Sequence, residues 1–156
     1  MPLSDLLHLL TPLVTSCRGF HEAWDASPAP APDDPLTGRW EGEWVSDANG
    51  FRGPLRAVMT RLDDRRWRAS FHATFARVLK ACYSTDLVID PGPERSGAPG
   101  ENYPAPKQSW TFTGVSDLGV FGGGVYEYAG EVSGDTFSSS FRARTDHGTF
   151  RMRRSR

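Results

Sequence analysis

The sequence contains four histidines and two cysteines, the side chains best suited to metal binding and to acid–base chemistry. They are His8, His21, His72, His147, Cys17 and Cys82. No two of them stand in a His-x-His or Cys-x-x-Cys arrangement, so the sequence predicts no structural metal site. His147 lies between Asp146 and Gly148, which favours a turn over an acid–base pair or a metal ligand. His72 alternates with a row of inward-facing aromatic residues, and we expect it to point to solvent.

The carboxylates and glycines form no catalytic motif. Glu41 and Glu43 share the expected outer face of a strand, so they are not expected to form the pair of catalytic carboxylates of a glycosidase. Glu127 has no second carboxylate with which to form such a pair. The run Gly122-Gly123-Gly124 could cradle a phosphate, but no Lys-Ser or Lys-Thr pair follows it. Neither a Gly-x-Ser-x-Gly motif nor a Cys–His arrangement is present. We therefore expect a protein that is not an enzyme and that carries no cofactor.

Length and charge narrow the class of protein further. The chain has 156 residues, a net charge of −1 and a pI near 6.4, which predicts one folded domain with no overall field that would attract nucleic acid. The arginines between residues 151 and 156 are interpreted as an exposed strand end. Sixteen glycines among many aromatic residues are typical of short strands joined by tight turns.

The segment 38–46 shows strand periodicity most clearly. Trp40 and Trp44 fall on one face of a strand, and Glu41 and Glu43 fall on the other. Similar alternation, separated by turn residues, continues to the end of the sequence. It predicts strands at about 38–46, 54–62, 67–75, 81–89, 107–115, 120–130, 136–144 and 149–154. We therefore expect an all-β fold, an eight-stranded antiparallel up-and-down barrel.

Closure of this barrel sets a register between its first and last strands, because an open edge would invite aggregation. The outer-face residues Glu41 and Glu43 should then face the arginines at 151 and 153. On the inner face, Arg154 should reach the barrel end and cover Trp40 through a cation–π contact. Both residues are thus expected to be structural.

Several segments resemble known families. The Gly-x-Trp that opens the first strand, Gly38-x-Trp40, resembles the calycins, the lipocalin and avidin type of barrel, over about residues 38–154. The extended pattern Gly38-x-Trp40-x-Gly42 is similar to haem-binding nitrobindin barrels, although Trp44 replaces the third glycine. The segment 38–47, the segment 118–128 and the ending 145–150 are similar to uncharacterised small bacterial lipoproteins. A weak internal similarity in the positions of tyrosine and glycine also resembles MORN-type hairpin repeats, which are a minor alternative.

The first 37 residues divide into two parts. Residues 1–17 hold a short apolar run that ends in Val14-Thr15-Ser16-Cys17, which resembles the lipobox of bacterial lipoproteins. The resemblance implies lipidation of Cys17 and a membrane anchor in the cell envelope, with Cys82 left as a free thiol; an amphipathic N-terminal helix in a cytoplasmic protein is the alternative. Residues 18–37, rich in Pro and Ala, are expected to be a tether before the barrel at 38–156.

Eight strands leave an interior that is either filled by side chains or just large enough for one small ligand. The aromatic residues expected to line a ligand site are Trp44, Phe71, Trp110, Phe112, Tyr126, Tyr128 and Phe141. The segment from Asp90 to Pro106 is expected to lie over one mouth as a flap.

The function favoured by these features is that of a non-enzymatic, membrane-tethered barrel. It would bind a small apolar ligand or serve as a structural module of the envelope. A haem- or metal-binding barrel with His147 or His72 as ligand is one alternative, and a protein-interaction module that uses the outer strands is another.

Overall fold

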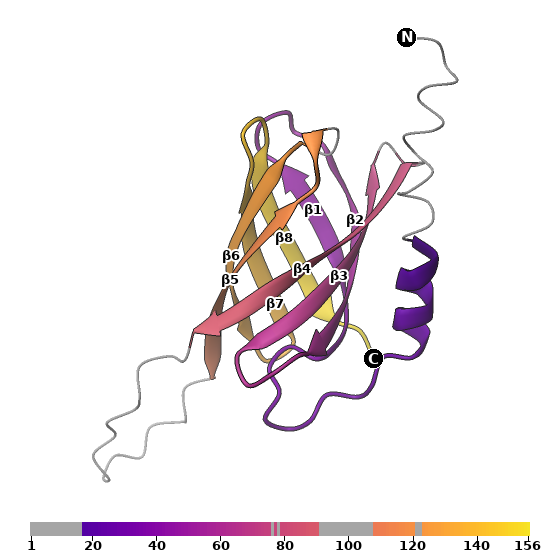
Figure 1. Cartoon of the computed structure of the whole chain (residues 1–156), viewed down its shortest axis with the longest axis vertical. Coiled ribbons are helices and arrows are strands. Elements are labelled where there is room, and N and C mark those ends of the chain that lie inside the picture. Colours follow the sequence, from indigo (N-terminus) through magenta and orange to yellow (C-terminus); the bar gives the residue numbers. More distant parts are fainter. Residues whose placement is uncertain (1–16, 76, 78, 91–107, 121–122) are drawn as a thin grey trace, which may run out of the picture.

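The computed structural model describes residues 17–75, 77, 79–90, 108–120 and 123–156, and eight strands make up most of them (Figure 1). The strands are β1 (Gly38–Ser46), β2 (Arg52–Arg61), β3 (Arg66–Phe75), β4 (Leu79–Asp90), β5 (Ser109–Asp117), β6 (Val125–Ser133), β7 (Thr136–Arg142) and β8 (His147–Arg154). The apolar run before residue 17, most of the expected flap at 90–106 and Gly122 lie outside the described residues.

The strands form a closed antiparallel barrel in which each strand pairs with the next and β8 pairs with β1. The up-and-down fold expected from the sequence is therefore confirmed. Closure also follows the expected register, with Glu41 opposite Arg153 and Glu43 opposite Arg151. The ion pair of Glu41, however, is made with Arg56 of β2, at 3.3 Å, and both side chains are about half exposed. Such an exposed pair adds little to stability.

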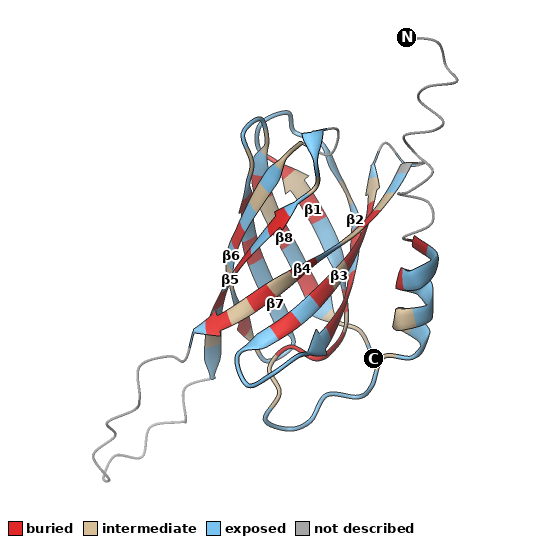
Figure 2. Ribbon diagram, in the orientation of Figure 1, coloured by how far each residue is buried: buried red, intermediate tan, exposed pale blue. Residues whose placement is uncertain are grey.

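Buried and exposed residues alternate along the strands (Figure 2), and the buried ones form one core, rich in aromatic residues, inside the barrel. Gly42 and Gly130 stand on the inner face where neighbouring backbone comes too close for a side chain. A Cβ atom on Gly42 would lie 1.8 Å from the carbonyl oxygen of Arg151, and one on Gly130 would lie 2.2 Å from that of Ser138. These glycines let the strands coil tightly around the large rings. The glycines Gly123 and Gly124, expected within a strand, have positive φ and precede β6.

One end of the barrel, here called the base, is sealed by the segment that leads into β1. Leu36 and Trp40 are completely buried there, and the indole N–H of Trp40 donates to the carbonyl of Leu36 at 2.8 Å. Arg154 lies over the Trp40 ring, with its guanidinium carbon 4.4 Å from the ring centroid. The expected cap of Trp40 by Arg154 is thus present.

A short carboxylate network completes the base. Asp34 accepts hydrogen bonds from the backbone N–H and the hydroxyl of Thr37, at 2.8 and 2.6 Å, and from the indole N–H of Trp67 at 3.1 Å. Burial alone would raise the pKa of Asp34, but these hydrogen bonds and that from Leu36 outweigh it and lower the pKa below its usual value. Residues 34–37 are therefore an ordered part of the barrel end, which differs from the loosely packed tether expected from composition.

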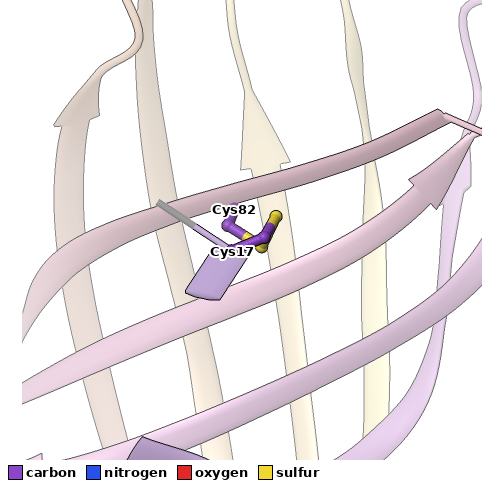
Figure 3. Close-up of a disulfide and its surroundings, with 2 residues drawn as sticks. All are labelled: Cys17 and Cys82. Carbon is purple, nitrogen blue, oxygen red and sulfur yellow. A yellow bond between two sulfur atoms is a disulfide. The ribbon is translucent and has the colours of Figure 1, made fainter. Parts of the chain in front are cut away.

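Residues 17–25 are helical and lie against the outer side of the barrel wall (Figure 1). Phe20 is buried there in a small cluster with Val58 of β2 and Cys82 of β4, separate from the barrel core. Cys17 forms a disulfide with Cys82, with the two Cα atoms 5.1 Å apart (Figure 3). Among the described residues, no helix combines the length and the apolar character needed to cross a bilayer.

This disulfide corrects the expectation that Cys82 is a free thiol. A sulfur atom in a disulfide cannot also carry the thioether of a lipid anchor. Disulfide formation and lipidation are therefore alternative states of Cys17, and lipidation stays a prediction. The helix also replaces the first part of the expected tether with a packed element.

Candidate functional site

The barrel interior is filled in its middle by rings that contact one another. The aromatic residues expected to line a ligand site all belong to the inner face, and five of them are buried: Trp44, Phe71, Phe112, Tyr128 and Phe141. Phe71 stacks on Tyr83 and on Tyr128, with centroids 5.2 and 6.3 Å apart, and Phe150 closes the group at 5.5 Å from Phe71. The main role of these five buried residues is therefore to pack the hydrophobic core.

The two remaining predicted ligand residues are partly buried and lie at opposite ends of the barrel. Trp110 lies near the base, and Tyr126 lies at the other end, here called the upper end, where the β1–β2, β5–β6 and β7–β8 connections meet. The structure therefore does not bring the seven residues together around one space. It places five of them in a packed middle and leaves one partly buried residue towards each end.

The upper end gathers hydroxyl groups inside the barrel. The hydroxyl of Tyr128 is 3.0 Å from that of the buried Ser116, and it also forms a hydrogen bond with the hydroxyl of Tyr83. The ring of Tyr126 stacks 6.5 Å from that of Tyr128. The Tyr126 hydroxyl lies beside Gly123, 2.7 Å from the position that a Cβ atom would take there.

Burial raises the pKa of all three tyrosines at this end. For Tyr83 the rise is large, and its hydrogen bond with Tyr128 adds to it. For Tyr126 the negative charge of Asp146 adds to burial. The three phenols therefore stay protonated at neutral pH, as hydrogen-bonding groups without charge.

Three exposed apolar residues lie in or next to the connections at the same end. Phe51 of the β1–β2 connection is 68% exposed, Val120 before β6 is 91% exposed and Val125, the first residue of β6, is 50% exposed. Exposed apolar residues scattered singly are normal, but these three belong to one end of the barrel. The upper end therefore has these exposed apolar residues, here called the apolar rim, as well as interior hydroxyl groups.

The base offers a concavity of a different kind. A hollow of about 700 Å³ is lined by the proline-rich segment 30–35, by Trp110 and by the β6–β7 turn, with Arg154 at its side. The guanidinium of Arg154 is already engaged by the carbonyls of Thr37 and Pro35 and by the carboxylate of Asp135. It therefore has no obvious capacity left to bind an anion in this hollow.

A second, shallower hollow of about 460 Å³ lies on the outer face over β5 to β8. Small residues of neighbouring strands, among them Ala129, Ser138 and Ser140, leave it open. This surface is the part of the outer wall that best suits the alternative of a protein-interaction module.

The candidate histidines do not enter the barrel interior. His147 begins β8 and is exposed. His72 points outward as expected, but it is only 8% exposed because the helix at 17–25 covers it. The expectation that His72 meets solvent is therefore wrong. Neither side chain is placed to bind haem inside the barrel.

Sequence reasoning missed Tyr83, Ser116 and Asp34 as residues that organise the two ends. The strand alternation does place Tyr83 and Ser116 on inner faces, and that was the available signal. The signal for Asp34 is weaker. An aspartate just before a strand can accept hydrogen bonds from the backbone N–H groups two and three residues later, here those of Leu36 and Thr37. Comparison of the chain with protein-family models, curated proteins and solved structures gives no significant match.

Proposed function

We propose that this protein is a non-enzymatic, calycin-like barrel that binds a small, largely apolar ligand with one polar end at the upper mouth. The observation that carries the proposal is the difference between the two barrel ends. At the base, the indole and guanidinium donors are satisfied by protein groups and the chain seals the opening. At the upper end, the partly exposed Tyr126 lies beside interior hydroxyl groups and an apolar rim.

The packed middle limits the ligand to this mouth. Because Phe71, Tyr128 and Phe150 contact one another, a ligand would lie above them and would not pass into the core. Apolar contact with the rim would supply most of the affinity, and one or two hydrogen bonds to the phenols would fix the polar end. A small phenol, an indole or a fatty alcohol has this chemistry.

The binding test is a titration of the purified protein with a panel of small planar phenols, indoles and fatty alcohols, followed by intrinsic fluorescence and native mass spectrometry. We expect saturable binding of one molecule per chain. Tyr126→Ala should lower the affinity at least tenfold, about 1.4 kcal/mol. Trp110→Phe, at the base, is the matched control and should leave the affinity unchanged.

A structural module of the envelope is the second candidate, and the ring-to-ring packing of the interior favours it. Absence of saturable binding across the whole panel would favour this candidate over the ligand-binding one. Loss of binding in Trp110→Phe but not in Tyr126→Ala would move the ligand site to the base.

The disulfide supports a location outside the cytoplasm, because disulfides persist in oxidising compartments such as the periplasm or the secretory pathway. Attachment to a membrane through a lipid on Cys17 is part of the same proposal only for molecules in which the disulfide is absent. Intact mass measurement of protein from its native host distinguishes the states. A chain that begins at Cys17 with added acyl mass indicates the anchor. A non-acylated chain that gains two hydrogens on reduction indicates the disulfide.

A further inference from the structure

The outer wall of the barrel carries a buried cluster of metal-binding side chains that the proposed ligand site does not use. It lies beneath the helix at 17–25 and includes Cys17 from the helix, His72 from β3 and Cys82 from β4. The two sulfur atoms and a ring nitrogen of His72 all lie within 4.8 Å of one another. All three residues are buried.

His72 carries a buried nitrogen atom whose bonding capacity no described residue uses. Its Nε2 atom is buried and has no hydrogen-bond partner among the described residues. A buried polar atom without a partner is rare, because it loses its bonds to water and gains nothing in return. The ring is held in place from the helix side, with its centroid 5.2 Å from that of Phe20 and 5.5 Å from that of His21. Lys80 and Arg56 lie close enough to His72 for their positive charges to act on its ring.

The elements bring donors to this position in two pairs. Cys17 and His21 are four residues apart, so they share one face of the helix. His72 and Cys82 are direct cross-strand partners in the β3–β4 ladder, so their side chains stand side by side on the outer face. The two sulfurs and the His72 imidazole supply three of the four donors of a tetrahedral zinc site. The exposed His21, with its ring centroid 5.5 Å from that of His72, is the candidate for the fourth.

We propose that reduction of the Cys17–Cys82 disulfide converts this cluster into a zinc site, with Cys17, Cys82 and His72 as ligands and His21 as the fourth. A dithiol reductant supplies two electrons and two protons, which cleave the S–S bond to two thiols, and the reductant becomes a disulfide. Zn²⁺ then binds both sulfurs as thiolates, and two protons are released. The two thiolates neutralise the ion, so the buried site carries no net charge beside Arg56 and Lys80.

The consequence is that one helix can be fastened to the barrel in two chemically different ways. The oxidised protein holds it through the disulfide, and the reduced protein holds it through the metal. Reduced protein without metal should release the helix more readily, because only non-covalent contacts, such as those of Phe20 and Trp24, then hold it to the wall.

The experiment uses the full chain, reduced with dithiothreitol and freed of reductant under argon, with Co²⁺ as the spectroscopic probe. We expect one Co²⁺ per chain, with visible bands of tetrahedral cobalt and a near-ultraviolet thiolate-to-cobalt charge-transfer band. Zn²⁺ should displace the Co²⁺ and bleach both. The oxidised protein should show neither band.

Variants separate this site from adventitious binding. His72→Phe keeps a ring in the apolar setting and removes the unpartnered nitrogen, so the oxidised barrel should fold normally while Zn²⁺ affinity falls at least about tenfold. His147→Gln, at the exposed start of β8, is the matched control and should bind as the unaltered protein does. Cys82→Ser leaves one thiolate at most, so the charge-transfer band should fall to half or less.

Either of two results would overturn the proposal. The first is that the reduced protein binds Co²⁺ without the thiolate band, and the second is that His72→Phe binds Zn²⁺ as tightly as the control. An unchanged cobalt spectrum in His21→Ala would overturn the assignment of His21 as the fourth ligand.

Discussion

Replacement of Arg154 by methionine tests whether the guanidinium group seals the barrel base. Only 14% of this side chain is exposed, and it combines three kinds of contact. It donates to the carbonyls of Thr37 and Pro35, pairs with Asp135 at 3.3 Å and covers the ring of Trp40. Methionine keeps much of the length and apolar stem of arginine but removes all of its donors and its charge.

The size of the effect follows from these contacts. Each carbonyl left without its donor costs about 1–3 kcal/mol if it stays buried. Loss of the cation–π contact adds about 1–2 kcal/mol in a partly desolvated setting. The pair with Asp135 adds little, because the Asp135 side chain is 71% exposed. If the base opens partly, water can bind the freed carbonyls and reduce this cost. We expect a net destabilisation of about 3–5 kcal/mol.

The assay is urea unfolding at neutral pH, followed by tryptophan fluorescence. Arg154→Met should lower the midpoint with little change in the denaturant slope. Arg154→Lys keeps the charge but not the fork of donors, so its loss should be intermediate. Arg153→Met is the matched control, because Arg153 is exposed on the outer face of the same strand, and its effect should stay within about 0.5 kcal/mol. Equal effects of Arg154→Met and Arg153→Met would refute the idea that the guanidinium closes the base.

Three further predictions concern other parts of the molecule. Reduction of the disulfide in metal-free solution should lower the free energy of unfolding by about 4 kcal/mol, because the cystine closes a loop of 65 residues, and denaturation with and without reductant measures this. Asp34→Asn should destabilise the barrel by about 2 kcal/mol at pH 7, since hydrogen bonds to its charged form are lost. Because the pKa of Asp34 is lower folded than unfolded, its contribution is full above the unfolded value of about 4 and falls as the pH drops through the folded value. The difference between wild type and Asp34→Asn should therefore shrink in acid, and a difference that persists below both values would contradict this. Gly42→Ala should destabilise by at least about 2 kcal/mol through the clash with the Arg151 carbonyl, whereas Gly50→Ala, at a turn with open space, should cost about 1 kcal/mol from its positive φ alone.

The barrel could be predicted from sequence because each strand is identified by the alternation of neighbouring residues. The alternation of Trp40 with Glu41 identifies a half-buried strand, and the need to cover both sheet edges then dictates the pairing of β1 with β8. Because side chains on one face recur every second residue, that pairing also sets Arg154 opposite Trp40 and Arg151 opposite Glu43.

The outer cluster could not be predicted in the same way, because alternation tells which face a residue takes but not what covers that face. His72 was correctly placed outside the barrel, yet the helix over it comes from residues more than 40 positions earlier. A signal was nevertheless present. Val58 and Cys82 are apolar residues on otherwise polar outer faces, and Cys17 and Phe20 have the spacing of one helical face. Together they indicate a covered patch and a helix able to cover it.

Pairing of the first strand with the last has a consequence for the order of events when the chain is made. The backbone N–H of Ser155 donates to the carbonyl of Arg39, across more than 100 residues of intervening sequence. During synthesis β1 cannot find its second neighbour until β8 has left the ribosome, so the ring cannot close on an incomplete chain. A chain that stops before β8 would therefore keep both edges of its sheet unpaired, and these open edges could pair with other chains.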